Sequence, residues 1–312
     1  MKKTCVIGSL NVDLFVTADH FPRPGENVNA DDMKIFTGGG KGANQAFSLG
    51  RLGAPVSMVG KLGKEFYGPK YLQVLKDTNV DCELIGMEEG FPGVGIVAVD
   101  RTGENSIYVY PGANGLVAPS FLEENWSKIE DHDLFLFQLE IPIESNLYAM
   151  KRLKESGKTI ILDPAPAQEI PDEMLQCCDI ATPNRTELEN LTNTRIEKNE
   201  DVETSARILL SRGVKTVVTK AGPVGAFITT AGGTEHLPGF KVDTVDTTAA
   251  GDSFNAGLAY ALGRGDALKD AVVFGNATAA ISTTALGAQN AMPTLEQVNA
   301  LIQESTPIVS TL

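Results

Sequence analysis

A short stretch near residue 250 combines acidic and small residues at the predicted start of a helix. It reads Asp246-Thr-Thr-Ala-Ala-Gly-Asp252-Ser-Phe254, and apolar residues then recur at helical spacing. A helix N-terminus leaves backbone amides free, and phosphate oxygens bind there. The amides concerned are those of Ala249, Ala250, Gly251 and Asp252. The Asp252 carboxylate could accept a proton from a hydroxyl that attacks phosphorus, so the stretch predicts phosphoryl transfer.

The same stretch also has a purely structural interpretation. Asp246, Thr247 or Thr248 could cap the helix, because Asp and Thr are favoured at the N-cap position. Taken alone, capping is the simpler explanation, and it leaves the role of Asp252 open.

Two motifs near the N-terminus carry the kinds of group that recognise a polyol. The first is Gly8-Ser-Leu-Asn11-Val-Asp13, and the second is Thr37-Gly-Gly-Gly40-Lys41-Gly-Ala-Asn44. Carboxylate and amide groups can each engage adjacent hydroxyls beside backbone-permissive glycine. Alternatively, Asn11 and Asp13 could be ordinary turn formers, and the glycines a flexible loop before a helix.

Two further polar positions follow predicted strands. Glu140, in Gln138-Leu-Glu-Ile-Pro142, lies at the end of a strand, where ligands of open α/β sheets collect. Asn184 and Glu187 have the spacing of a capping box, which is compatible with a second role at a ligand.

The elements that must position these residues alternate along the chain. Apolar runs of strand type are Thr4–Ile7, Val56–Val59, Leu134–Phe137, Thr159–Leu162, Ile180–Thr182 and Val214–Thr219. Helical patterns between many of them predict an α/β fold with a mostly parallel central sheet flanked by helices. Residues 12–37 and 93–110 break this rhythm, and the second region has the pattern of a β-hairpin. We expect them to pair as a small β-sheet lid inserted in a single domain of residues 1–312, with a frayed tail from Glu304 to Leu312.

The composition restricts the classes of partner. The 312 residues include 26 Lys and Arg and 40 Asp and Glu, a formal net charge of -14. This charge argues against nucleic acid or an anionic membrane as a partner. The N-terminal apolar run is too short for a signal peptide or a membrane span, so we expect the chain to stay in the cytosol.

Together, these motifs resemble those of the PfkB, or ribokinase, family of carbohydrate kinases. The stretch from Asp246 to Phe254 is similar to the C-terminal signature of the family, and both N-terminal motifs match in type and spacing. The resemblance implies a ribokinase-like fold, Asp252 as the catalytic base, and an anion hole formed by the amides of residues 249–252. It also implies that the sugar is held by Asn11, Asp13, Gly40, Lys41, Asn44, Glu140 and Asp252.

The resemblance further implies sites for a nucleotide and for ions. Residues expected near ATP and its Mg²⁺ are Asn184, Glu187, Lys220, Gly222, Gly225 and Asn276. Ligands expected for a monovalent cation, K⁺, are Asp246, Thr248, Ser282, Ala285 and Gly287. Ala291 falls where some relatives offer a hydroxyl, so water or backbone would have to replace that ligand.

The activity that the resemblance implies is transfer of the γ-phosphoryl group of ATP to O5 of D-ribose, giving ribose 5-phosphate and ADP. Alternative acceptors are 2-deoxyribose, fructose or a nucleoside, and a catalytically silent sugar-binding regulator is a further alternative. The intact Asp252 and anion-hole segment argue against the regulator. The lid sheet also offers a surface for self-pairing. By analogy with the family, the resemblance implies a homodimer through the lid.

Overall fold

Ten strands form the central sheet of the computed structural model, which describes residues 1–304. In order across the sheet they are β14 (Gly233–Pro238), β13 (Gly225–Thr230), β12 (Thr216–Lys220), β11 (Ile180–Ala181), β10 (Thr159–Leu162), β9 (Leu134–Phe137), β1 (Thr4–Ile7), β4 (Val56–Gly63) and β5 (Val80–Asp81), with β6 (Ile85–Glu88) paired to β4. The strands from β12 to β5 run parallel, whereas β13 and β14 pair antiparallel. The predicted, mostly parallel sheet is therefore confirmed.

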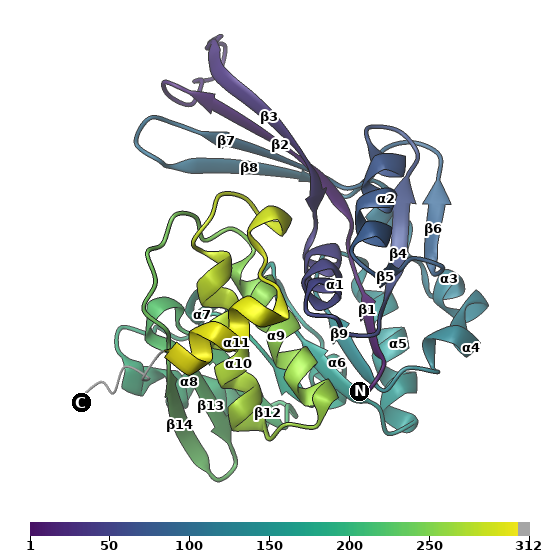
Figure 1. Ribbon diagram of the computed structural model, residues 1–312, viewed down its shortest axis with the longest axis vertical. Helices are drawn as coiled ribbons and strands as arrows, with labels where there is room; N and C mark the ends of the chain where they lie inside the picture. Colours follow the sequence, from purple (N-terminus) through teal and green to yellow (C-terminus); the bar gives the residue numbers. More distant parts are fainter. Residues whose placement is uncertain (305–312) are drawn as a thin grey trace.

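Helices cover both faces of this sheet (Figure 1). They are α1 (Lys41–Arg51), α2 (Gly68–Asp77), α3 (Pro119–Glu124), α4 (Trp126–Ile129), α5 (Ile143–Glu155), α6 (Asp172–Cys177), α7 (Arg185–Thr192), α8 (Asn199–Ser211), α9 (Ala250–Arg264), α10 (Leu268–Ser282) and α11 (Leu295–Glu304). Short 3-10 turns are η1 (Gly112–Leu116), η2 (Gly222–Val224) and η3 (Gln289–Ala291). Within residues 1–304, none of the helices has the length and apolar character needed to cross a membrane. Most of the predicted frayed tail, residues 305–312, lies outside the described part of the chain.

Two hydrophobic cores follow from the alternation of side chains along the buried strands. In β1, Val6 faces the core that α1, α2, α9, α10 and α11 cover, while Cys5 and Ile7 face the core covered by α3 to α8. In β9, Leu134 and Leu136 likewise separate from Phe135 and Phe137. Burial on both faces explains why these strands are continuous apolar runs in the sequence.

The second sheet stands off the body in Figure 1 and has the strand order β3-β2-β7-β8. Its strands are β3 (Ala30–Gly39), β2 (Asn11–Ala18), β7 (Val94–Val99) and β8 (Asn105–Tyr110). β7 and β8 form the predicted hairpin, and β2 pairs with β7 in parallel, with Leu14 opposite Ile96. The predicted pairing of the two inserted regions into a lid sheet is therefore confirmed.

The fold brings polar residues to the carboxyl ends of four central strands. Ser9 follows β1, Gln138 follows β9, Asp163 follows β10, and Lys220 is the last residue of β12. Because neighbouring parallel strands end at the same edge of a sheet, these residues and the start of the lid strand β2 gather on one side of the molecule.

Candidate active site

Helix α9 begins without a side-chain cap. Its N-cap residue, Ala249, adopts a left-handed backbone with φ of 58°, and no side chain accepts a capping hydrogen bond. The Asp246 carboxylate accepts instead from the backbone amide and the hydroxyl of Thr248, at 2.9 and 2.7 Å. The interpretation that Asp246, Thr247 or Thr248 caps this helix is therefore wrong. A non-glycine residue in the left-handed region is uncommon, and such residues cluster at functional sites.

The uncapped helix start leaves backbone donors available. Among residues 1–304, the amides of Gly251 and Asp252 have no hydrogen-bond acceptor, whereas the amide of Ala250 donates to Thr247 O at 3.2 Å. Free amides at a helix N-terminus attract anions through both hydrogen bonding and the helix dipole. The geometry therefore fits an anion site, to which the Gly251 and Asp252 amides are open.

The Asp252 carboxylate is in the first turn of α9 and is buried, with 5% of the residue exposed. Its Oδ2 accepts a hydrogen bond from Asn44 Nδ2 at 2.9 Å, and Gln45 Nε2 lies 3.4 Å from Oδ1. Burial raises the pKa of Asp252 to about 6; Lys41 opposes this rise and Asp163 adds to it. The carboxylate is therefore fixed by α1 and has the basicity of an effective proton acceptor near neutral pH.

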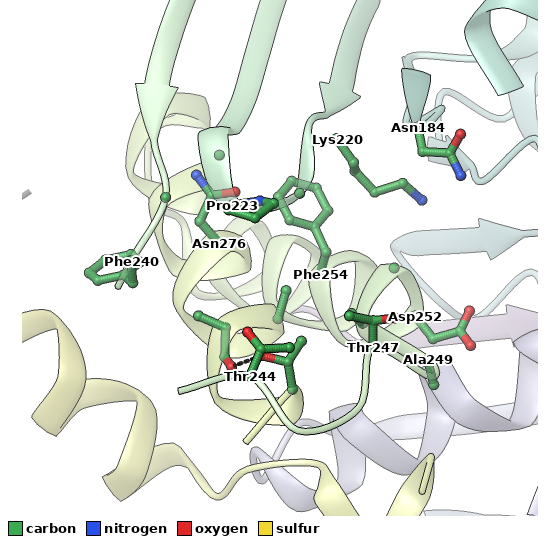
Figure 2. A pocket seen from close by; sticks show the side chains of 18 of the residues that line it. Asn184, Lys220, Pro223, Phe240, Thr244, Thr247, Ala249, Asp252, Phe254 and Asn276 are labelled. Atoms are coloured by element: carbon green, nitrogen blue, oxygen red, sulfur yellow. Dashed lines mark hydrogen bonds between the residues drawn. The ribbon is translucent and has the colours of Figure 1, made fainter. Parts of the chain in front are cut away.

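A cavity of about 570 Å³ opens beside the start of α9. All the residues predicted to bind nucleotide line it, namely Asn184, Glu187, Lys220, Gly222, Gly225 and Asn276. The segment 249–252 and Lys41 line it as well. Figure 2 shows Phe240 and Asp252 on opposite sides of the view. A cavity with an apolar wall at one end and charged groups at the other suits a nucleotide.

Asn184 and Glu187 form the predicted capping box at the start of α7. Asn184 Oδ1 accepts from the Glu187 amide at 2.8 Å, and Glu187 Oε2 accepts from the Asn184 amide at 2.7 Å. Burial raises the pKa of Glu187, Lys220 lowers it, and Asp163 raises it further. Both residues also line the cavity, so capping and a ligand role are compatible here.

Asn276 lies on α10 and faces the cavity beside Pro223 (Figure 2). Its Nδ2 is 3.3 Å from both Leu237 O and Pro238 O, at the end of β14. These contacts fix the side-chain amide against the cavity wall.

A second cavity, of about 370 Å³, lies between the lid and the body. Asn11 and Glu140 line it, together with Asn114. Asn11 Oδ1 accepts from Asn114 Nδ2 at 2.7 Å, while Glu140 Oε2 accepts from Ser9 Oγ at 2.5 Å and the Lys41 amide at 2.9 Å. The polar groups of this cavity are therefore fixed by one another.

Asp13 is held at the base of the lid between two glycines. Its Oδ1 accepts from the Gly95 amide at 3.0 Å. A β-carbon at Gly39 would lie 2.1 Å from Oδ2, and one at Gly95 would lie 2.5 Å from Oδ1, so a side chain at either position would displace the carboxylate. Burial raises the pKa of Asp13 to about 6, the Gly95 amide lowers it, and Glu140 raises it.

Gly40 and Lys41 open helix α1 beside these residues. Gly40 has a φ of 83°, and a β-carbon there would lie 2.8 Å from the Asn11 amide, so both backbone and space require glycine. Burial is the largest influence on the pKa of Lys41 and lowers it, but nearby carboxylates raise the pKa overall. These carboxylates are Asp252, Asp163, Glu140 and Glu187.

The residues predicted to bind a monovalent cation lie in two segments that meet. The amides of Val245 and Asp246 donate to Thr283 O, and the Gly287 amide donates to Asp246 Oδ2 at 2.8 Å. Burial alone would raise the pKa of Asp246, but hydrogen bonds from Thr248 and Gly287 lower it overall.

The other predicted cation ligands flank this junction. Ser282 ends α10 and donates to Ala279 O at 2.8 Å, and Ala285 lies between that helix and Gly287. Ala291 is buried in η3 and brings no hydroxyl.

Comparison of the chain with known protein families identifies its family. Residues 1–295 match the family described as pfkB family carbohydrate kinase. The chain belongs to this family.

Individual relatives agree with the PfkB assignment over nearly their whole length. The ribokinase of Staphylococcus aureus is 35% identical over 299 residues, covering 95% of this chain and 98% of that protein. A deoxyribokinase of Salmonella typhi is 34% identical, covering 94% of this chain and 96% of that protein. The structure of Arabidopsis thaliana ribokinase complexed with ribose and ATP has a TM-score of 0.92 and 30% identity, covering 97% of this chain and 99% of that chain. The ribokinase-like fold is thereby confirmed.

Buried side chains of this PfkB-family site that were not predicted from the sequence include Asp163, Gln45, Gln289 and Tyr71. Asp163 Oδ2 accepts from Gln45 Nε2 at 3.1 Å, and its Oδ1 pairs with Lys220 Nζ at 2.8 Å. Gln289 Nε2 donates to Asn44 Oδ1 at 3.2 Å and to Tyr71 OH at 2.8 Å. The sequence could have indicated Asp163, because it is an acidic residue directly after a predicted buried strand.

Proposed function

We propose that the protein transfers the γ-phosphoryl group of ATP to O5 of D-ribose, giving ribose 5-phosphate and ADP. The observation that carries this proposal is the position of Asp252. Its carboxylate accepts from Asn44 of the N-terminal sugar motif, while its own backbone amide belongs to the free helix start. One residue thus joins the predicted acceptor side to the predicted phosphate side.

Ribose binds under the lid in this account. Asn11, Asp13 and Glu140 present carboxylate and amide oxygens to the sugar hydroxyls, with Gly40, Lys41 and Asn44 at the start of α1 beside them. Their existing hydrogen bonds keep these groups in place before the sugar arrives, which lowers the entropy cost of binding. The lid sheet excludes water that would otherwise compete as the phosphoryl acceptor.

The chemical step then needs a base and a place for negative charge. As the O5 oxygen bonds to the γ-phosphorus, the bond from that phosphorus to the bridging oxygen of ADP breaks. The O5 proton passes to the Asp252 carboxylate. The free amides of Gly251 and Asp252 donate to the phosphoryl oxygens, where charge develops in the transition state.

The nucleotide occupies the larger cavity, with Asn276 near its base and the loop of Lys220, Gly222 and Gly225 along its phosphates. The donors present fit Mg²⁺ held mainly by phosphates: within residues 1–304 no group of three or more His, Cys, Asp or Glu could hold a metal, and Glu187 is a partly buried carboxylate that lines the cavity. Bound Mg²⁺ would neutralise phosphate charge.

The junction of residues 246–248 with residues 282–287 fits K⁺, because its donors are oxygens. Asp246, Thr248 and Ser282 supply a carboxylate and hydroxyls, and Ala285 and Gly287 supply backbone carbonyls. We expect K⁺ to stiffen the loop that precedes the free amides.

The exposed lid strand β8 supports a homodimer formed through the lid. Ile107, Tyr108, Val109 and Tyr110 are each at least half exposed, with Tyr108 at 73%. We propose that a second copy covers this row. Light scattering would show a dimer for the unchanged protein and a monomer for Tyr108→Lys; a monomeric unchanged protein would contradict the proposal.

2-Deoxyribose is the second candidate acceptor, because the deoxyribokinase relative is nearly as similar as the ribokinase relative. An ADP-release assay over pentoses, hexoses and nucleosides, run with K⁺ and with Na⁺, tests both. We expect the highest kcat/KM with ribose, and faster turnover with K⁺ than with Na⁺. A folded protein that releases no ADP with any sugar would instead support a sugar-binding regulator.

A further inference from the structure

Lys220 holds a positive charge in an unusual place. It is the last residue of β12, and its side chain is only 12% exposed. A β-carbon at Gly251 would lie 3.3 Å from Lys220 Nζ, so the ammonium group rests against the free first turn of α9. Figure 2 shows the side chain extending from its strand into the space between Asn184 and the helix that carries Asp252.

This arrangement places like charges together. The N-terminus of a helix carries a partial positive charge, and the Gly251 and Asp252 amides have no acceptor in the described chain. An anion between the ammonium group and that terminus would be attracted by both. The cavity that Lys220 and Gly251 both line has room for such an anion.

Asp163 fixes the ammonium group in this position. The distance from Lys220 Nζ to Asp163 Oδ1 is 2.8 Å, and Asp163 is 2% exposed. The second oxygen of Asp163 accepts from Gln45 Nε2, which also lies 3.4 Å from Asp252 Oδ1. The lysine is therefore held by a buried carboxylate that belongs to the same network as the candidate base.

We propose that the Lys220 ammonium group contacts the γ-phosphoryl group during transfer and stabilises its transition-state charge, with Asp163 as its positioning residue. This role rests on the proposed kinase function and goes beyond the membership of Lys220 in the nucleotide loop. The ammonium keeps its proton throughout. The O5 proton still passes to Asp252, and ADP leaves as the bond from the γ-phosphorus to its bridging oxygen breaks.

The test compares Lys220→Met with Lys215→Met. Lys215 comes directly before the first residue of β12, whereas Lys220 is its last residue, so Lys215 lies at the opposite end of the strand from the cavity. Its Nζ pairs with Asp179 Oδ1 at a similar 2.7 Å, but its side chain is 64% exposed. We expect Lys220→Met to lower kcat on the order of 100-fold with the KM for ribose unchanged, as for loss of one oxyanion donor. Lys215→Met should keep normal kinetics, and Lys220→Arg should recover part of the rate.

A purely structural ion pair predicts a different result in the double variant. If Lys220 serves only to neutralise Asp163, adding Asp163→Asn to Lys220→Met removes the buried charge and should restore both turnover and melting temperature. Under the proposal, the double variant folds but stays slow. Restored turnover in the double variant would overturn the proposal.

A binding measurement separates this proposal from the proposed function. Calorimetric titration with ATP and with ADP, each without sugar, should show tighter binding of ATP to the unchanged protein and loss of that preference in Lys220→Met. If the unchanged protein fails to phosphorylate ribose, the proposed function falls, yet this comparison still decides the contact of Lys220 with the γ-phosphate. An unchanged ATP preference in Lys220→Met would overturn that contact.

Discussion

The sugar side and the phosphate side of the site differ in what their polar groups contact. On the sugar side, side chains are held by one another and by glycine amides, as in the pairs of Asn11 with Asn114 and of Asp13 with Gly95. On the phosphate side, the backbone amides of Gly251 and Asp252 remain free within residues 1–304. In the proposed mechanism, the first region is ordered for selectivity, whereas the second keeps free donors for the charge that develops during the reaction.

The difference implies that substitutions should act separately on the two sides. Changes on the sugar side should alter the KM for ribose, and changes on the phosphate side should alter kcat. Asp252 belongs to both sides, because its carboxylate contacts Asn44 and its amide is free.

The largest expected effect is that of Asp252→Asn, which keeps the shape but removes the base. We expect kcat to fall about 1,000-fold, within the range for loss of general base catalysis, and the affinity for ribose to change little. Steady-state ADP release and calorimetry with ribose measure the two quantities. The matched control is Asp243→Asn, the same substitution at an exposed residue.

The same variant should be more stable than the unchanged protein. Burial raises the pKa of Asp252 from 3.8 to about 6, so ionisation costs the folded state roughly 3 kcal/mol above pH 6. The free energy of unfolding of the unchanged protein therefore decreases as the pH rises from 4 to 6, whereas that of the variant does not. Denaturation at pH 7.5 and pH 4 should show the gain at the higher pH only; a destabilised variant at pH 7.5 would contradict the burial argument.

Asp13→Asn is the most direct way to weaken ribose binding on the sugar side. The single oxygen of the new amide can still accept from the Gly95 amide, but the charged partner of a sugar hydroxyl is lost. We expect the KM for ribose to rise about 10- to 100-fold, as for hydrogen bonds to charged groups, with kcat within about threefold of normal. A fall in kcat with an unchanged KM would remove the distinction between the two sides.

Acidification should affect both sides, since the pKa values of Asp252 and Asp13 are both raised to about 6. Protonated Asp252 cannot accept the O5 proton, so kcat/KM for ribose, which reports the ionisations of the free enzyme, should fall at least tenfold from pH 7 to pH 5. The acid limb of the kcat/KM profile should persist in Asp13→Asn. A profile that stays flat from pH 7 to pH 5 would argue against Asp252 as the base.

The smallest effect is expected from Gln289→Met, which removes the donor to Asn44 and Tyr71. Because Asn44 positions Asp252, we expect kcat to fall about 10-fold, as for other supporting residues around a reactive group. Gln303→Met, at an exposed position of α11, should have no effect on kcat. Equal kinetics in the two variants would show that Gln289 does not position the base.

Much of this site could be predicted because its parts are local in the sequence. Glycine-rich and acidic motifs directly follow strands, so their place at the sheet edge follows from the alternating pattern. The contacts of Asp163 with Lys220 and of Gln289 with Asn44 span 57 and 245 residues, and no local pattern specifies them. The capping prediction failed because the N-cap position falls on Ala249, and the Asp246 carboxylate accepts from Thr248 rather than from the amides of the helix.

The most direct test of the account is the identity of the product. ³¹P NMR of a reaction with ATP and ribose, run in parallel for the unchanged protein and Asp252→Asn, distinguishes the possible phosphate positions. We predict ribose 5-phosphate and ADP in equal amounts from the unchanged protein, and almost none from the variant over the same time. A phosphate on another hydroxyl, ADP without sugar phosphate, or near-normal product from Asp252→Asn would contradict the account.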